Sequence, residues 1–212
     1  MPQLTTLLIQ NGVPEHVLTW MFMLPIAITF AVIGRQIIGV KGFSITSPIL
    51  IGFAFAAIGL ESGLVIFFAV LGIGFLVKSA LDNIRLLYLP KMALILLGIS
   101  VAMPIVVLFL PNRESIQLYY AAFSIMILAL SAEQFASSLM ERGQRKTLGI
   151  ALETLAVSIA IFFLATWGWL ANIVLTYPLF VLVASILANL FLGKWTGLRL
   201  SEYIRFKKII FR

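Results

Sequence analysis

The segment "KMALILLGISVAMPIVVLFL" (residues 91–110) decides the fold, because Lys91 and Ser100 are its only polar residues. It is as long as the roughly 20 residues that a helix needs to cross a membrane. Similar stretches recur along the chain of 212 residues, which is 62% hydrophobic and only 11% charged. In soluble domains about a quarter of the residues are charged. The composition therefore predicts a polytopic membrane protein, built as an all-α helix bundle.

The apolar stretches number seven, and we expect them to form the seven transmembrane helices of a single domain. The second stretch is short, and "GLESGL" (residues 59–64) leaves only a minimal turn before the third. Pro48, Pro90 and Pro178 lie near the starts of stretches, where the missing N–H of proline costs little. The expected spans cover about residues 17–35, 44–60, 62–80, 91–110, 117–139, 148–170 and 174–193.

The distribution of basic residues predicts the orientation of the bundle. With seven spans, every one of the 15 lysines and arginines except Arg113 falls on the same side. Cytoplasmic loops carry such an excess of basic residues, so we expect the N-terminus outside and the C-terminus in the cytoplasm. An even number of spans would remove this bias. The expected location is the inner (cytoplasmic) membrane, which the chain crosses several times.

The residue inventory favours a protein that is not an enzyme. The chain has no cysteine, and its single histidine, His16, precedes the first span, so cysteine sites and multi-histidine metal sites are excluded. No Walker motif, zinc-binding helix or nucleophile elbow is present, and we expect no cofactor. The net charge of +7 indicates basic loops beside a lipid bilayer rather than a nucleic-acid partner.

Two acidic residues, Glu133 and Glu153, lie inside expected spans, whereas the other acidic residues lie in loops, at span ends or in the tail. At 1.5 Å per residue, both are about 9–10 Å inside the cytoplasmic boundary, on adjacent antiparallel helices. Gln134 lies beside Glu133, and Asn189 of the seventh span has a similar depth. We expect a polar pocket formed by Glu133, Gln134, Glu153, Asn189 and Arg35.

The role of the two carboxylates has several interpretations. A carboxylate inside the membrane costs about 2.5–3.5 kcal/mol on insertion scales, so each should face the bundle interior and find a partner. Candidate partners are Arg35, Lys78 and Lys91, which lie near inner span ends. Alternatively the two carboxylates share one proton, because a neighbouring like charge raises one pKa. Either glutamate alone favours a structural bond, whereas the matched pair favours a pocket for a cation, a proton or an amine.

The loop between the first two spans, in "GVKGFSITSPILIG" (residues 39–52), is rich in glycine and hydroxyl groups. Lys41, Ser44, Thr46 and Ser47 could line a cytoplasmic cleft or form a short re-entrant turn, which is tolerated only when protein surrounds it. We favour the simpler interpretation, an ordinary loop in which Ser47 caps the following helix.

The C-terminal tail, residues 195–212, mixes basic and large apolar residues. We expect it to bind either anionic lipid headgroups, at about 1 kcal/mol per basic residue, or a partner protein. The basic residues expected at that surface are Arg199, Arg205, Lys207 and Lys208.

Two stretches resemble a bacterial membrane family, the seven-helix domain usually fused behind an inactive transglutaminase-like domain. "RQIIGVKGFSITSPILIGFAFAAIGLESGL" (residues 35–64) is similar to the Arg-x-x-x-Gly-(Val/Ile)-Lys motif before the family's second helix. "GKWTGLRLSEYIRF" (residues 193–206) is similar to its terminal Thr-Gly-x-Arg-Leu-(Ser/Thr)-Glu motif. The acidic position of its fifth helix corresponds to Glu133. The other matching residues are Arg35, Gly39, Val40, Lys41, Thr196, Gly197, Arg199, Leu200, Ser201 and Glu202.

The resemblance implies an association with ATP-grasp amide ligases that join amino acids. The transglutaminase-like domain has no counterpart in this sequence, so work outside the membrane would belong to a partner chain. Our leading hypothesis is a non-catalytic membrane subunit that anchors or assists such a ligase and holds or passes its product. The alternative is a small transporter coupled to protons or cations through Glu133 and Glu153. A purely structural subunit of a larger membrane complex is a third hypothesis.

Overall fold

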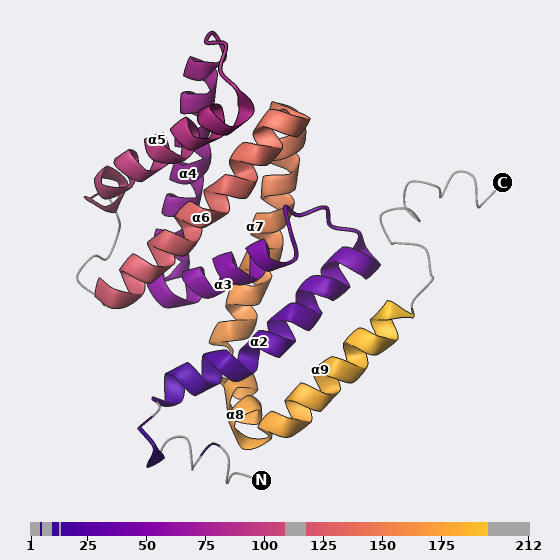
Figure 1. Cartoon of the computed structure of the whole chain (residues 1–212). Helices are drawn as coiled ribbons and strands as arrows, with labels where there is room; N and C mark the ends of the chain where they lie inside the picture. Colours follow the sequence, from indigo (N-terminus) through magenta and orange to yellow (C-terminus); the bar gives the residue numbers. More distant parts are fainter. Residues whose placement is uncertain (1–4, 6–9, 13, 109–117, 195–212) are drawn as a thin grey trace, which may run out of the picture.

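The structure is a computed structural model that describes residues 5, 10–12, 14–108 and 118–194. All regular elements of this described part are helices, and none is a strand (Figure 1). The all-α fold expected from composition is therefore confirmed. The tail residues Arg199, Arg205, Lys207 and Lys208 lie outside the described residues, as does the connection that contains Arg113.

Five helices are long and apolar enough to cross a membrane. The first of them, α2, continues into a π-helical turn, η1, and the chain leaves this turn at Gly39 with a φ of 88°. The five are α2 (Glu15–Ile33) with η1 (Gly34–Ile38), α4 (Leu60–Leu81), α5 (Tyr88–Leu108), α6 (Leu118–Arg142) and α7 (Gln144–Thr166).

The second apolar stretch forms α3 (Thr46–Ile58), which has only 13 residues. At 1.5 Å per residue it is about 20 Å long, well short of a hydrocarbon core of about 30 Å. Other helices surround it, because α3 contacts α4, α6 and α7. Its side chains Ile51 and Phe55 are at most 1% exposed. The short helix therefore lies inside the bundle.

The last two segments depart most from the expected spans. Helix α7 ends at Thr166, before the expected residue 170, because Trp167 takes an extended conformation with φ −76° and ψ 103°. A separate helix follows, α8 (Gly168–Thr176), and α9 (Pro178–Gly193) meets it at an angle of 102°. If this bent pair is one broken span, the five long helices, α3 and the pair make seven apolar segments.

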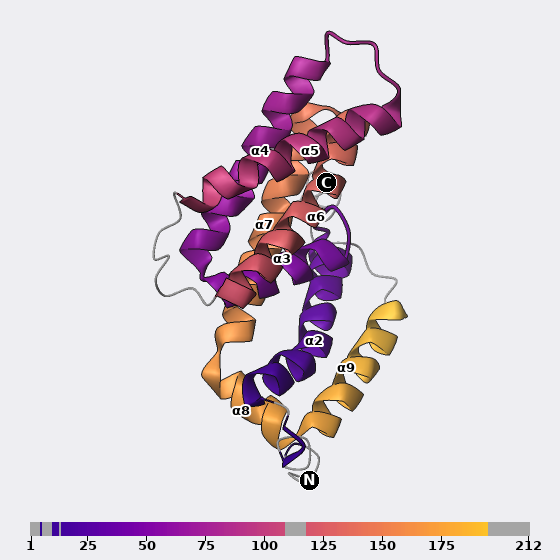
Figure 2. The same cartoon turned by 60° about the vertical axis from the view of Figure 1, so that its left-hand side comes forward.

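Two connections consist of a single glycine with positive φ. Gly59 (φ 87°) separates α3 from α4, and Gly143 (φ 78°) separates α6 from α7. A side chain would strain the backbone in this left-handed region. The α4–α5 and α6–α7 connections lie at the same end of the molecule, which is the upper end in Figures 1 and 2. Helices α6 and α7 are thus antiparallel neighbours, as the sequence predicted.

The main apolar core lies where α3, α4, α5 and α6 meet. Phe55, Ile66, Ile95 and Phe135, one from each of these helices, are at most 2% exposed. Inside a bilayer, close van der Waals packing rather than removal from water stabilises such a core. This core holds α6 in a fixed rotation, which matters for the polar residues on its other side.

Helix α3 approaches α7 closely through a glycine. A methyl group added at Gly52 would lie 2.7 Å from Cγ2 of Ile161 and 2.9 Å from the carbonyl oxygen of Ser158. Small residues allow such close contact between helix backbones in membrane proteins. No larger residue fits at Gly52 without moving α7.

Helix α9 lies along α2 at the edge of the bundle (Figures 1 and 2). Nε2 of Gln36 in η1 donates a hydrogen bond to the carbonyl oxygen of Leu192, near the end of α9. Large apolar side chains of α9, such as Phe180 and Leu190, remain exposed in the isolated chain. A lipid-facing helix carries such side chains on its outer side.

Candidate functional site

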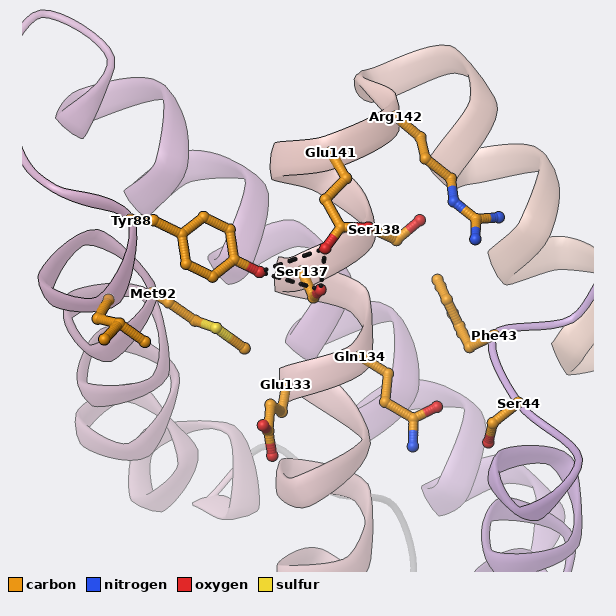
Figure 3. Close-up of a pocket in the computed structure, with 11 residues that line it drawn as sticks. Phe43, Ser44, Tyr88, Met92, Glu133, Gln134, Ser137, Ser138, Glu141 and Arg142 are labelled. Atoms are coloured by element: carbon orange, nitrogen blue, oxygen red, sulfur yellow. Dashed lines mark hydrogen bonds between the residues drawn. The ribbon is translucent and has the colours of Figure 1, made fainter.

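A cavity of about 480 Å³ opens along one face of α6, between the start of α5 and the α2–α3 loop, residues 39–45 (Figure 3). Small-molecule sites in proteins have volumes of about 300–1,000 Å³. Polar and apolar side chains both line the cavity. The lining residues are Phe43, Ser44, Tyr88, Leu89, Met92, Glu133, Gln134, Ser137, Ser138, Glu141 and Arg142.

The helical period of α6 places the acidic residues of the cavity on one side. Glu133, Ser137 and Glu141 follow one another at intervals of four residues, so their side chains lie one above another. Phe135 and Leu139 belong to the opposite side and are 2% exposed. Helix α6 therefore separates the apolar core from the polar cavity.

One carboxylate of the cavity belongs to a small hydrogen-bonded cluster. Tyr88 Oη lies 3.2 Å from Ser137 Oγ and donates to Glu141 Oε1 at 3.5 Å. Ser137 Oγ also donates to Glu141 Oε1, at 3.1 Å (Figure 3). These bonds tie the start of α5 to α6 and provide partners for the Glu141 carboxylate.

The α2–α3 loop forms the other wall, and hydroxyl groups hold it in place. Ser44 Oγ accepts the backbone N–H of Ser47 at 3.0 Å, and it lies 2.9 Å from Thr46 Oγ1. The hydroxyl of Ser47 donates to Oε1 of Gln134 on α6. The N-cap of α3 is Ile45, which makes no side-chain cap; Ser44, one residue earlier, accepts a backbone N–H of the first turn, and Ser47, the expected cap, instead joins the loop to α6.

Glu153 lies on α7 beneath the same loop and has a structural contact. Its Oε2 accepts the backbone N–H of Lys41. One residue further, Thr154 Oγ1 accepts the backbone N–H of Phe43 at 3.2 Å. Two adjacent side chains of α7 therefore satisfy two backbone donors of the loop, which would otherwise need water or another partner. Glu153 does not line the cavity.

Glu133 has a different environment, because it makes no hydrogen bond or ion pair within the described residues. Its side chain is exposed to the cavity, although the residue lies inside the apolar span Phe123–Arg142. Arg142 is also exposed, lines the cavity, and has no ion-pair partner in the described part of the chain. Within the described residues, the cavity therefore contains the carboxylate of Glu133 without any partner and the guanidinium of Arg142 without an ion pair, beside the hydrogen-bonded carboxylate of Glu141.

The family described as 7 transmembrane helices usually fused to an inactive transglutaminase matches residues 4–210. The chain belongs to this family. The match covers all seven apolar segments and the cavity. Comparison with curated proteins and with solved structures gives no match. Among the described residues of this seven-helix domain, no group of three or more His, Cys, Asp or Glu side chains could hold a metal ion.

The lysines considered as partners for the glutamates pair with another residue. Lys78 of α4 and Lys91 of α5 both bind the Asp82 carboxylate, Lys91 at 2.8 Å. The hydrogen bond from Lys78 is the main cause, and the one from Lys91 the next, that holds the pKa of Asp82 below its ordinary value. The three side chains fasten the α4–α5 connection and leave Glu133 without a basic partner in the described chain.

The remaining residues of the expected pocket lie elsewhere in the seven-helix domain. Arg35 lines a separate cavity of about 20 Å³ beside Thr154. Asn189 of α9 donates from Nδ2 to Thr29 Oγ1 of α2 and to the carbonyl oxygen of Ser185, each at 2.8 Å. Of the five residues expected together, only Glu133 and Gln134 line the large cavity.

Sequence reasoning missed eight of the eleven residues that line this cavity, among them Tyr88, Ser137, Glu141 and Arg142. Ser137 and Glu141 carried a usable signal, because they lie four and eight residues after Glu133 on the same helical face. Tyr88 carried no signal in the sequence, since its position in the cavity depends on how α5 packs against α6. Arg142 was assigned only to the basic inner loops.

Proposed function

We propose that this seven-helix domain is a non-catalytic membrane subunit that docks a cytoplasmic partner and holds that partner's product in the cavity on α6. The partner class that we propose is an amide ligase of the ATP-grasp type, which joins amino acids. The observation that carries this proposal is the position of the cavity. It opens beside the α4–α5 and α6–α7 connections, where the exposed basic residues gather.

The charge around the cavity supports docking of a protein. Arg85 is exposed in the α4–α5 connection, and Arg145 and Lys146 are exposed in the first turn of α7; none of the three forms an ion pair within the described residues. An acidic surface on a partner would be attracted to them, because complementary charges speed encounter and fix orientation. The family description supports the non-catalytic part of the proposal, since related domains usually share a chain with an inactive transglutaminase.

Affinity purification from native membranes tests the docking role. We expect the wild-type chain to recover an amide ligase, and the double variant Arg145→Glu, Lys146→Glu to recover at least tenfold less. Glu61→Lys is the matched control, because Glu61 is exposed at the opposite end of α4. Recovery of the wild-type chain without a ligase, from membranes in which the ligase is expressed, contradicts the proposal.

A second candidate function is transport coupled to protons or cations. The unpaired carboxylate of Glu133 within α6 favours it. The contact of Glu153 with the Lys41 backbone favours a structural role for that residue instead. Transport through a pair of carboxylates predicts that Glu133→Gln and Glu153→Gln each abolish pH-dependent uptake into vesicles. Undiminished uptake in both variants rules this function out.

A further inference from the structure

We infer that the cavity on α6 binds a short peptide as a zwitterion, with its ammonium group at Glu133 and its carboxylate at Arg142. The inference rests on the proposed function, in which the cavity holds the product of a partner, and it specifies that product's chemistry and orientation. It starts from the two charged side chains that line the cavity without partners in the described chain.

The spacing of these two charges sets the length of the ligand. Glu133 and Arg142 are nine residues apart on α6, so their backbone positions differ by about 13 Å along the helix axis. An extended peptide spans about 3.3–3.6 Å per residue. Nine residues also turn the helix by about 180°, so Glu133 and Arg142 flank the cavity from opposite edges of α6 (Figure 3). Because both side chains are long, a peptide of about two to four residues that lies across this face of α6 spans the separation.

The wall between the charges suits a peptide backbone. Tyr88, Ser137 and Gln134 present hydroxyl and amide groups to the cavity, between the levels of Glu133 and Arg142 (Figure 3). A bound peptide brings N–H and C=O groups that need partners when water is displaced. Glu141 also brings a negative charge to the cavity; Tyr88 and Ser137 donate hydrogen bonds that orient its carboxylate but do not neutralise it.

The order of the charges selects a water-soluble ligand rather than a lipid. Arg142 is the last residue of α6, whereas Glu133 lies deeper in the span. In phosphatidylethanolamine the phosphate is attached to the glycerol, and the ammonium points outward to water. Such a headgroup would place its ammonium near Arg142 and its phosphate near Glu133, which is the wrong order. A peptide that enters the cavity from the water with its ammonium group first places its charges in the order that Glu133 and Arg142 require.

Binding of trialanine to the purified full chain tests this inference. The chain is placed in nanodiscs of phosphatidylcholine and phosphatidylglycerol, which contain no primary amine, and binding is followed by calorimetry. We expect trialanine to bind in the micromolar to millimolar range. We expect N-acetyl-trialanine and trialanine amide each to bind about ten- to hundredfold more weakly, because each lacks one charge-assisted contact.

Two variants assign each end of the peptide. Glu133→Gln should weaken trialanine about tenfold or more and leave N-acetyl-trialanine unchanged; Arg142→Gln should weaken trialanine and leave the amide unchanged. The matched controls, Glu61→Gln and Lys194→Gln, change exposed charges outside the cavity and should bind trialanine like the wild type.

Several results overturn the inference. Equal binding of trialanine and its N-acetyl form, or no binding of trialanine at millimolar concentration, excludes the assigned orientation or the site itself. Displacement of trialanine by added phosphatidylethanolamine would identify a headgroup site instead. No partner is present in this experiment. If the chain binds the peptide but recovers no ligase, only the docking role is overturned. If it recovers a ligase but binds no peptide, only this inference is overturned.

Discussion

Glu133 of α6 and Glu153 of α7 belong to two regions that treat a carboxylate in opposite ways. Beneath the α2–α3 loop, Glu153 accepts a backbone N–H and its neighbour Thr154 accepts another. On the far side of α6, Glu133 faces an open cavity and has no partner within the described residues. The first region uses its polar groups to fix the chain, and the second leaves a charge available. This difference is why we propose a ligand for the second region and a structural role for the first.

The largest expected effect concerns the closed region, where α3 meets α7. Gly52→Leu should lower the free energy of unfolding by about 3 kcal/mol, since even its Cβ would lie 2.9 Å from the Ser158 carbonyl oxygen. Thermal unfolding in nanodiscs, monitored by tryptophan fluorescence, measures this loss of stability. Gly72→Leu is the control, because nothing lies within 4 Å of a Cβ at Gly72. Similar losses at both positions would show that α3 and α7 are not packed this closely.

A smaller effect separates the two glutamates by stability. Glu153→Ala should destabilise the protein by about 1.5–2 kcal/mol, because the Lys41 N–H loses its charged acceptor. Glu133→Ala should change stability by less than about 0.5 kcal/mol, since the carboxylate has no partner to lose. Chemical or thermal unfolding of both variants in one membrane mimetic makes the comparison. A greater loss for Glu133→Ala would reverse the roles that we assign.

The loop contact itself gives a related test. Thr154→Val should cost about 1–2 kcal/mol, because the N–H of Phe43 loses its acceptor while the shape of the side chain is kept. Hydrogen exchange at residues 41–45 should also speed up in this variant. Thr166→Val is a suitable control, since Thr166 is exposed and bonds only within its own helix. Unchanged exchange in Thr154→Val would mean that α7 does not hold the loop.

The smallest effect depends on pH and lies outside both regions. The pKa of Asp82 is lowered in the folded protein by hydrogen bonds from Lys78 and Lys91, so its charge stabilises the fold above the ordinary pKa of 3.8. This contribution is lost as the pH falls through the lower, folded pKa. Because Asp82 is exposed, Asp82→Asn should cost less than about 1 kcal/mol near neutral pH. Melting temperatures of the two proteins should converge in acid; a gap that widens there would contradict the pairing.

Much of the fold could be predicted from the sequence, because hydropathy locates each apolar segment and the basic residues mark the connections between segments. The break at Trp167 could not be predicted, since the residues on both sides are apolar and hydropathy carries no information on backbone angles. The bent pair α8 and α9 was hidden for the same reason.

The site could be predicted only in part, for a geometric reason. Position along a helix gives the depth of Glu133 and Glu153, but each residue turns a helix by about 100°. Which side of α6 faces the core depends on packing by residues such as Phe135. Matched depth therefore did not bring the two carboxylates into one cavity. The Lys78–Asp82 pair, by contrast, follows from a spacing of four residues that the sequence displays.

Selective labelling of carboxylates tests the central contrast most directly. The wild-type chain in nanodiscs is treated with a water-soluble carbodiimide and an amine, and the modified residues are identified by mass spectrometry. We expect Glu133 to react and Glu153 to remain largely unmodified beneath the loop. Equal modification of the two glutamates, or modification of Glu153 alone, would contradict the assignment of one carboxylate to a ligand and the other to the fold.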